Sequence, residues 1–112
     1  MLTDDQRRRT IAERVDYWVE RLKVPSPRLR VQRMTRKWGS CSTSGYITLA
    51  SDLADQEPGF QDFVIAHELL HFRIPNHGKL FKALLAAHVP DWRKYDIGKP
   101  KDANGSKLVP GE

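Results

Sequence analysis

The chain has 112 residues, enough for one domain with a single hydrophobic core, which excludes a multidomain arrangement. A hydrophobic share of 39% and a charged share of 29% are typical of a globular protein, and no apolar run is long enough to span a bilayer. The single cysteine, Cys41, excludes an intrachain disulfide, and the net charge of +5 permits acidic partners without identifying one.

The N-terminal segment lacks the apolar stretch of a secretory signal, so we expect a cytoplasmic protein. Thr3 and Gln6 have the spacing of a capping box, in which each side chain satisfies a free backbone N–H at a helix start. The apolar positions that follow recur at helical spacing and form one stripe: Ile11, Val15, Trp18, Val19 and Leu22. Pro25 and Pro27 end this helix, which we interpret as an element that covers the core.

The next segment has the pattern of strands and turns. Leu29 and Val31 alternate with polar neighbours, as on a half-buried strand. Residues 42–45 have the composition of a turn, and residues 46–49 have high β-propensity. We therefore expect an antiparallel pair or a three-stranded meander, followed by a polar loop over residues 52–59.

A second helix, predicted from about Phe60 to Phe72, is apolar on almost every side and should be buried nearly all round. It nevertheless carries His67, Glu68 and His71 in its centre. Burying ionisable groups without partners is costly, so these three residues need a common reason to be there. A turn ends this helix, and a third amphipathic helix follows with these apolar positions: Leu80, Phe81, Leu84 and Leu85.

The sequence of residues 67–71, His-Glu-Leu-Leu-His, is the HExxH pattern. Residues four apart lie on one face of a helix, so the two imidazoles can bind one metal ion. Glu68 lies on the same side and can accept a proton from a metal-bound water. The pattern therefore predicts a metal centre.

A catalytic zinc site uses three protein ligands and one water, so a third ligand should follow the helix. His77 fits this position, because it lies just beyond Pro75 in a turn that Gly78 allows to bend sharply. His88 is the competing ligand. Two carboxylates are weaker competitors: Asp91 and Asp96.

Such a site predicts a peptidase. The metal lowers the pKa of its water toward about 7 and polarises the scissile carbonyl, and Glu68 passes the water proton to the leaving amine. Four residues are chemically able to stabilise the oxyanion, and the sequence does not choose among them: Tyr46, Arg73, His88 and Tyr95. The strand predicted over residues 36–41 is a candidate edge for an extended peptide.

Several stretches resemble the YgjP-like metallopeptidase family: residues 37–42 (Lys-Trp-Gly-Ser-Cys-Ser), residues 45–49, and residues 67–77 with Phe81. The spacing of the three histidines also resembles the WLM and SprT-like peptidases. The resemblance covers about residues 33 to 85. It implies an α+β zincin-like fold, with a small antiparallel sheet packed on an active-site helix and flanking helices. It also implies one Zn²⁺ per chain, bound by His67, His71 and His77, with Glu68 as the catalytic residue.

The chain departs from the family pattern at two positions, with Lys37 where Arg is common and Ala50 where Asn is common. It also lacks an extra N-terminal β-region of longer members, and so resembles the minimal members called minigluzincins. We interpret Trp38 as a packing residue. We interpret Cys41 as a buried small apolar residue rather than a thiolate that caps zinc.

We expect residues 1–97 to form one domain and residues 98–112 to form a flexible tail. Leu108 and Val109 could anchor this tail in the substrate groove as a weak self-inhibitor. The leading hypothesis is a soluble zinc peptidase that acts on peptides or proteins and has no membrane partner.

Two alternatives remain. One is a DNA-associated, protein-directed protease with a basic patch of Arg28, Arg30, Arg33, Arg36 and Lys37. Nucleic-acid binding is possible, but we favour the interpretation that these are solvated strand faces. The other is a metal-binding scaffold without turnover, which has no need of Glu68. The oligomeric state is not predictable from the sequence.

Overall fold

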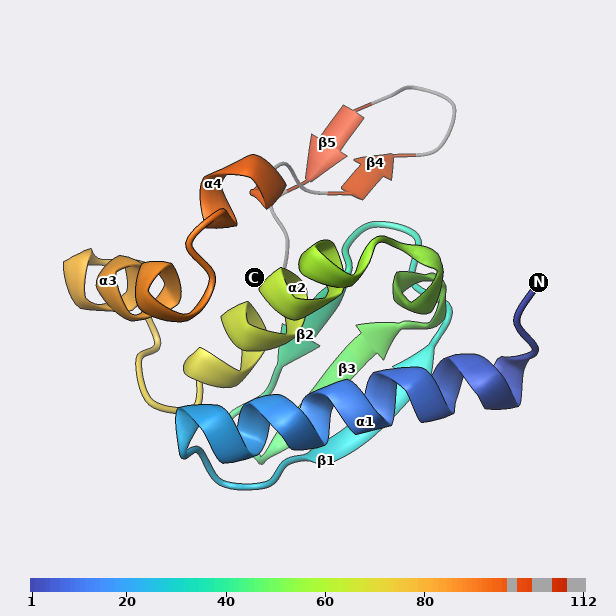
Figure 1. Cartoon of the computed structure of the whole chain (residues 1–112), viewed down its shortest axis with the longest axis horizontal. Helices are drawn as coiled ribbons and strands as arrows, with labels where there is room; N and C mark the ends of the chain where they lie inside the picture. The colour runs from blue at the N-terminus through green and yellow to red at the C-terminus, as the bar shows by residue number, and fades with distance from the viewer. Residues whose placement is uncertain (97–98, 102–105, 109–112) are drawn as a thin grey trace.

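The computed structural model describes residues 1–96, 99–101 and 106–108, and it has two layers, a three-stranded sheet with helices on one face (Figure 1). In chain order the elements are α1 (Asp4–Leu22), β1 (Arg28–Gln32), β2 (Gly39–Cys41), β3 (Tyr46–Ala50), a 3-10 helix η1 (Ser51–Asp55), α2 (Pro58–Leu70), α3 (Lys79–His88), α4 (Trp92–Tyr95), β4 (Lys99–Lys101) and β5 (Ser106–Leu108). The expected α+β class is confirmed.

The N-terminal helix forms as its sequence predicts. The Thr3 hydroxyl accepts from the Gln6 backbone, and the Gln6 side chain accepts from the Thr3 backbone, so the capping box is complete. Four residues of the apolar stripe are buried: Ile11, Val15, Trp18 and Leu22. The helix ends at Lys23, whose positive φ of 56° turns the chain before the prolines are reached.

The sheet is mixed, which corrects the expectation of an antiparallel sheet or meander. β3 lies in the centre; β1 pairs with it in parallel, and β2 pairs with it antiparallel. Ile47 and Leu49 of β3 are fully buried, so the most apolar strand takes the central position. The arginine-rich β1 and the short β2 take the edges, where one side of each strand does not need a partner.

The second helix lies across the sheet and contributes most of the core (Figure 1). It begins with Pro58 at its first turn, a position where proline has no backbone hydrogen bond to lose. Trp38, the residue before β2, is buried and meets Phe60 edge to face, with ring centroids 5.2 Å apart. This contact supports the interpretation of Trp38 as a packing residue. The predicted loop over residues 52–59 is partly replaced by η1.

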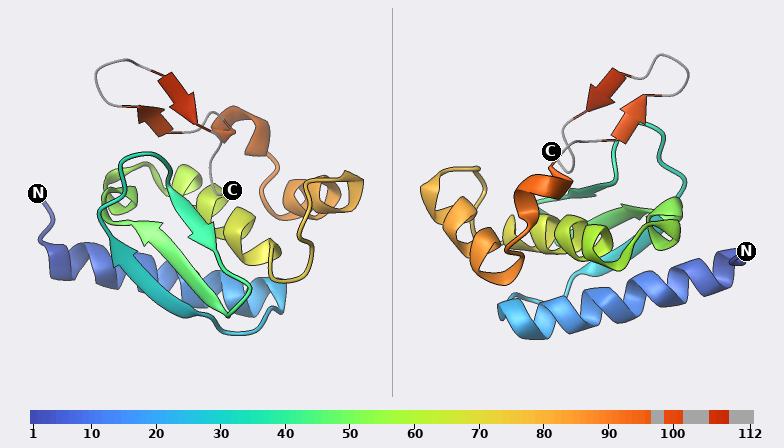
Figure 2. Two further views of the ribbon diagram at one scale, coloured as in Figure 1. Left: turned by 180° about the vertical axis from the view of Figure 1, so that it is seen from behind. Right: turned by 45° about the horizontal axis from the view of Figure 1, so that its top comes forward.

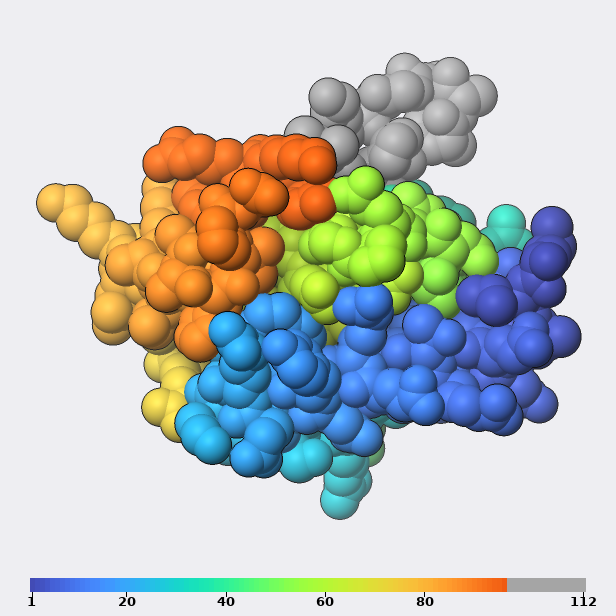
Figure 3. Space-filling model, viewed as in Figure 1, coloured from blue at the N-terminus to red at the C-terminus, as the bar shows by residue number. Residues whose placement is uncertain are grey.

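The side chains of α1, α2, α3 and α4 fill the helical side of the molecule (Figure 3). The apolar residues Trp92, Tyr95 and Ile97 are also predicted from the sequence to pack on the core. Trp92 and Tyr95 of α4 do so, whereas Ile97 lies outside the described residues. Within the predicted tail, β4 and β5 pair antiparallel; Val109 lies outside the described residues, and the flexibility of the tail remains a prediction. No helix of the described part combines the length and apolar character needed to cross a bilayer.

Candidate metal centre

Three histidines converge where α2 ends and α3 begins. One ring nitrogen from each of His67, His71 and His77 lies within 4.8 Å of the other two, an arrangement that could hold a metal ion. His67 lies on α2, His71 caps its C-terminal end, and His77 follows in the connection to α3. The helix α2 ends at Leu70, two residues earlier than predicted. His67 and His71 nevertheless lie on the same face, because His71 is the C-terminal cap residue of the helix.

The connection between α2 and α3 directs His77 back toward the helix. The Asn76 side-chain oxygen accepts a hydrogen bond of 2.9 Å from the Gly78 backbone, which closes a tight turn around His77. A Cβ atom at position 78 would lie 2.8 Å from that oxygen, so a larger residue would have to displace the Asn76 side chain. The φ of Gly78 is −74°, which any residue adopts, so the turn does not use the conformational freedom of glycine expected from the sequence. The result is a distance of 3.0 Å between the Nε2 atoms of His71 and His77.

Phe81 of α3 is buried and packs against all three imidazoles. Its ring centroid is 5.3 Å from that of His67, 4.8 Å from that of His71 and 4.9 Å from that of His77. Such contacts restrict the rotamers of all three rings. Apolar periodicity predicts Phe81 as a core residue of α3, but its contact with the three histidines could not be deduced from spacing.

The donor set fits a zinc ion. Two nitrogens that bind one tetrahedral zinc at about 2.0–2.1 Å lie about 3.3 Å apart, close to the 3.0 Å between the two Nε2 atoms. The Ile74 carbonyl accepts a hydrogen bond of 3.1 Å from Nδ1 of His71, which leaves the Nε2 lone pair of that ring available to a metal. Burial, and secondarily the neighbouring His67, lower the pKa of His71, so its neutral form prevails at neutral pH.

Glu68 is fully buried beside these histidines. Its Oε2 atom lies 3.3 Å from Nδ1 of His67, and no hydrogen-bond partner of its Oε1 atom is found among the described residues. A buried carboxylate oxygen without a donor is costly and calls for an explanation at the site itself.

Gly39 allows β2 to approach the helix at this point. A Cβ atom at position 39 would lie 2.8 Å from Cδ2 of Leu49 and 3.2 Å from Cγ of Glu68. Any side chain there would press on the glutamate. The glycine is part of the stretch that carries the family resemblance, but its contact with Glu68 is visible only in the tertiary structure.

Cys41 of β2 is half-buried rather than buried, and it lines an open cavity of about 500 Å³ together with His71 and His77. Burial, and secondarily the charge of Glu68, raise the pKa of the Cys41 thiol to about 11. The thiol is therefore protonated at neutral pH, which argues against a free thiolate at this position.

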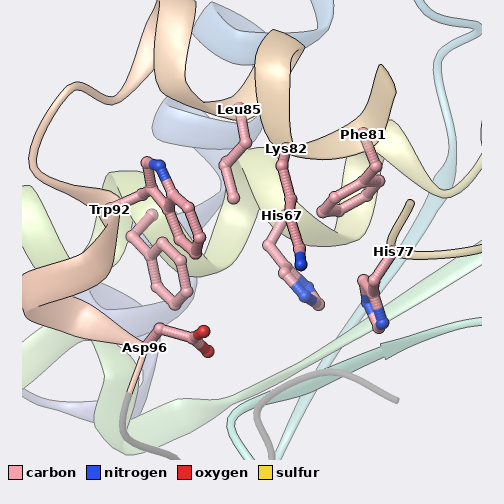
Figure 4. Close-up of a pocket in the computed structure, with 8 residues that line it drawn as sticks. His67, His77, Phe81, Lys82, Leu85, Trp92 and Asp96 are labelled. Carbon is pink, nitrogen blue, oxygen red and sulfur yellow. The ribbon is translucent and has the colours of Figure 1, made fainter. Parts of the chain in front are cut away.

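A second cavity, of about 150 Å³, adjoins the histidines on the α3 side (Figure 4). His67 and His77 form part of its wall, and the apolar part is formed by Phe63, Phe81, Leu85 and Trp92. Two charged side chains, Lys82 and Asp96, also line it. From the sequence, Asp96 is only a weak candidate ligand, and nothing in the sequence distinguishes Lys82 from the other exposed lysines of the chain.

The four residues proposed for the oxyanion line neither cavity. Tyr46 contacts Arg28 and Arg30 on the sheet. Tyr95 packs on the rings of Phe60 and Phe63, and Arg73 donates to the Lys23 carbonyl. His88, which also competed as a ligand, meets the ring of Trp18 edge to face instead.

Comparison with known proteins agrees with this geometry. The fold is that of metallopeptidases, and the three histidines form a cluster that could hold a metal ion. The sequence profile of the family described as YgjP-like, metallopeptidase domain, matches residues 2–96, so the chain belongs to this family. No curated protein matches the chain significantly.

Two solved structures share the fold. One is the metallopeptidase zymogen jannalysin of Methanocaldococcus jannaschii, with a TM-score of 0.65 and 25% identity, covering 70% of this chain and 80% of that chain. The other is the metallopeptidase zymogen abylysin of Pyrococcus abyssi, with a TM-score of 0.69 and 16% identity, covering 77% and 88%. Membership of the family implies a divalent metal and peptide or protein substrates.

Proposed function

We propose that the protein is a zinc-dependent peptidase in which His67, His71 and His77 hold one Zn²⁺ per chain and Glu68 is the acid–base residue. The observation that carries this proposal is the fully buried Glu68 carboxylate, whose Oε1 atom has no donor among the described residues. A buried carboxylate with one oxygen lacking a donor stabilises the fold poorly. Beside three converging imidazoles, it is well placed to accept and donate a proton.

Each residue has a distinct role in the proposed reaction. Zinc, when bound, supplies a water of lowered pKa and polarises the scissile carbonyl. Glu68 holds the proton of the attacking water on its carboxylate and delivers it to the leaving amine. Phe81 and the Ile74 carbonyl keep the imidazoles in orientation, and Lys82 supplies positive charge in the adjoining cavity.

Two surfaces beside the histidines can bind a peptide substrate, the free edge of β2 and an apolar cavity. Among the described strands, β2 pairs on one side only, so an extended peptide can lie along its other side. The cavity lined by Phe63, Leu85 and Trp92 offers an apolar surface for a substrate side chain next to the scissile bond. Both features favour peptide hydrolysis over a metal-binding scaffold.

The proposal is tested by metal analysis of the purified protein together with digestion of a peptide library, run in parallel on Glu68→Gln. We expect one zinc per chain in both proteins and peptide cleavage only by the unsubstituted protein. Cleavage by Glu68→Gln at a similar rate would remove Glu68 from the mechanism, and a protein without zinc would remove the metal.

Both similar structures are described as zymogens. We propose that this protein is also latent, and that its C-terminal tail lowers turnover as a tethered self-inhibitor. A shortened chain that ends at Gly98 tests this idea, because its turnover should exceed that of the full chain.

A further inference from the structure

The positive charge of the protein is concentrated in the segment that builds the sheet. Residues 21–51 contain seven Lys or Arg and no Asp or Glu, whereas the remaining residues contain twelve Lys or Arg and fourteen Asp or Glu. The net charge of +5 therefore originates in this segment, since the rest of the chain is more acidic than basic. Such segregation gives one part of the surface a field of a single sign.

The exposed side of the sheet carries this charge. Its side chains, which we call the outer face, are Arg28 and Arg30 of β1, Ser40 of β2, and Tyr46 and Thr48 of β3. In the strand register Arg28 lies opposite Tyr46, and both Arg30 and Ser40 lie opposite Thr48. The alternate residues of β3 are buried against the helices. The left view of Figure 2 shows the strands in front of α1 and α2, so no described helix covers the outer face.

The connection from β1 to β2 adds three basic residues at one end of this face: Arg33, Arg36 and Lys37. Because β3 separates the two strands, this connection has to cross the carboxyl end of β3. None of these three residues, nor Arg28 or Arg30, forms an ion pair with a described residue. The five cations are therefore available to an anionic partner.

An aromatic ring lies among these cations. The Arg30 guanidinium is 4.0 Å from the centroid of the Tyr46 ring, and the Arg28 guanidinium is 5.7 Å from it. Arg28 also donates a hydrogen bond of 3.2 Å to the Tyr46 hydroxyl, and the hydrogen bonds from Arg28 and Arg30 lower the pKa of Tyr46. Stacked guanidinium and phenol groups form a flat cationic platform of the kind on which unpaired bases stack.

The sequence alone favours solvated strand faces for these residues, but the stack of Arg30 on Tyr46 is visible only in the structure. We propose that the outer face binds single-stranded nucleic acid, with the basic residues on its phosphates and the Arg30–Tyr46 stack on its bases. A single strand suits this face better than a duplex, whose bases are already stacked. It also suits it better than an acidic polypeptide, which offers charge without bases. The outer face lies on the opposite side of the sheet from the histidines, so a bound strand leaves the proposed catalytic site accessible.

Fluorescence anisotropy with a short labelled oligothymidylate, measured on the full chain at several salt concentrations, tests the proposal. If all five cations contact phosphates, a plot of the logarithm of the association constant against the logarithm of the salt concentration should have a slope of about −3.5. Arg28→Gln/Arg30→Gln should reduce this slope to about −2. The matched control Arg9→Gln/Lys79→Gln removes two exposed charges from α1 and α3 and should leave the slope unchanged.

If the first double variant fails to fold, Arg33→Gln/Arg36→Gln carries the same expected slope. Base stacking is tested at Tyr46: Tyr46→Ser should weaken binding about 5- to 150-fold, whereas Tyr46→Phe should bind normally. The proposal would be overturned if the double variants of the outer face and the control Arg9→Gln/Lys79→Gln had the same salt-dependence slope. Competition by poly-glutamate as strong as that by oligothymidylate, or tighter binding of duplex than of single strand, would also overturn it.

Discussion

Replacing Glu68 by Gln should stabilise the metal-free protein while it strongly lowers the turnover of the zinc-loaded protein. The carboxylate is fully buried, and its Oε1 atom has no donor among the described residues. Its Oε2 atom has one long hydrogen bond of 3.3 Å, with Nδ1 of His67. An unsatisfied buried polar group costs about 1–3 kcal/mol, and more when charged. The amide keeps the shape without the charge, so we expect the free energy of unfolding to rise by about 1–3 kcal/mol. For a chain of this length that is about 4–12 °C in melting temperature.

The matched control is Asp62→Asn, the equivalent change at a carboxylate of the same helix that has partners. Its Oδ1 atom accepts from Nη1 of Arg14 at 2.5 Å and from Nε1 of Trp18 at 2.9 Å. Asn keeps the acceptor oxygen but not the charge, so both bonds become weaker and stability should fall by about 1 kcal/mol. The two variants should therefore shift in opposite directions in thermal unfolding followed by circular dichroism with a chelator at neutral pH.

Turnover of a peptide substrate in zinc completes the comparison, and Glu68→Gln should lose about 10²- to 10⁴-fold. A melting temperature of metal-free Glu68→Gln that falls, as in Asp62→Asn, would show that the carboxylate has a stabilising partner. It would refute the reasoning that the site holds this group at a cost in stability.

Four further predictions concern the metal, the glycine of β2 and the tail. Chelation should lower the melting temperature of the unsubstituted protein by several degrees, because it leaves polar groups unsatisfied in an apolar helix; an unchanged curve in calorimetry would mean that the histidines have other partners. His77→Ala should weaken zinc binding more than about 100-fold, whereas His88→Ala should not, and an exchange of these effects in a metal titration would make His88 the third ligand. Gly39→Ala should lower peptide turnover while zinc remains bound, since its Cβ would lie 3.2 Å from Cγ of Glu68; full turnover would show that β2 does not set the position of the glutamate. Truncation after Gly98 should leave the melting temperature unchanged and raise turnover; unchanged turnover argues against inhibition, and a large loss of stability argues against an independent tail.

Local sequence patterns predicted the elements well because their information lies within a few residues. The capping box at Thr3 and the stripe that includes Ile11 and Trp18 depend only on the 3.6-residue period, and the structure confirms both. The same period placed the histidines of residues 67–71 on one helix face. The all-round apolar character of that helix predicted its burial, which the structure also confirms.

The arrangement of the elements was decided by long-range packing. Nothing in the alternation of Leu29 and Val31 indicates that β1 pairs in parallel with β3 rather than antiparallel, because alternation reports which side of a strand is buried and not its partner. The approach of Gly39 to Glu68 and the contact of Phe81 with three imidazoles join segments that no spacing rule relates.

The distribution of charge is likewise determined partly by the sequence and partly by the tertiary structure. That residues 21–51 lack acidic side chains is a property of the sequence and needs no structure. Whether their arginines form a surface depends on the order of the strands, because β3 in the centre places Tyr46 beside Arg28 and Arg30. The sequence by itself thus determined which residues carry the chemistry and the charge. Only the tertiary structure decided which of them meet, since contacts between distant segments depend on packing of the whole core.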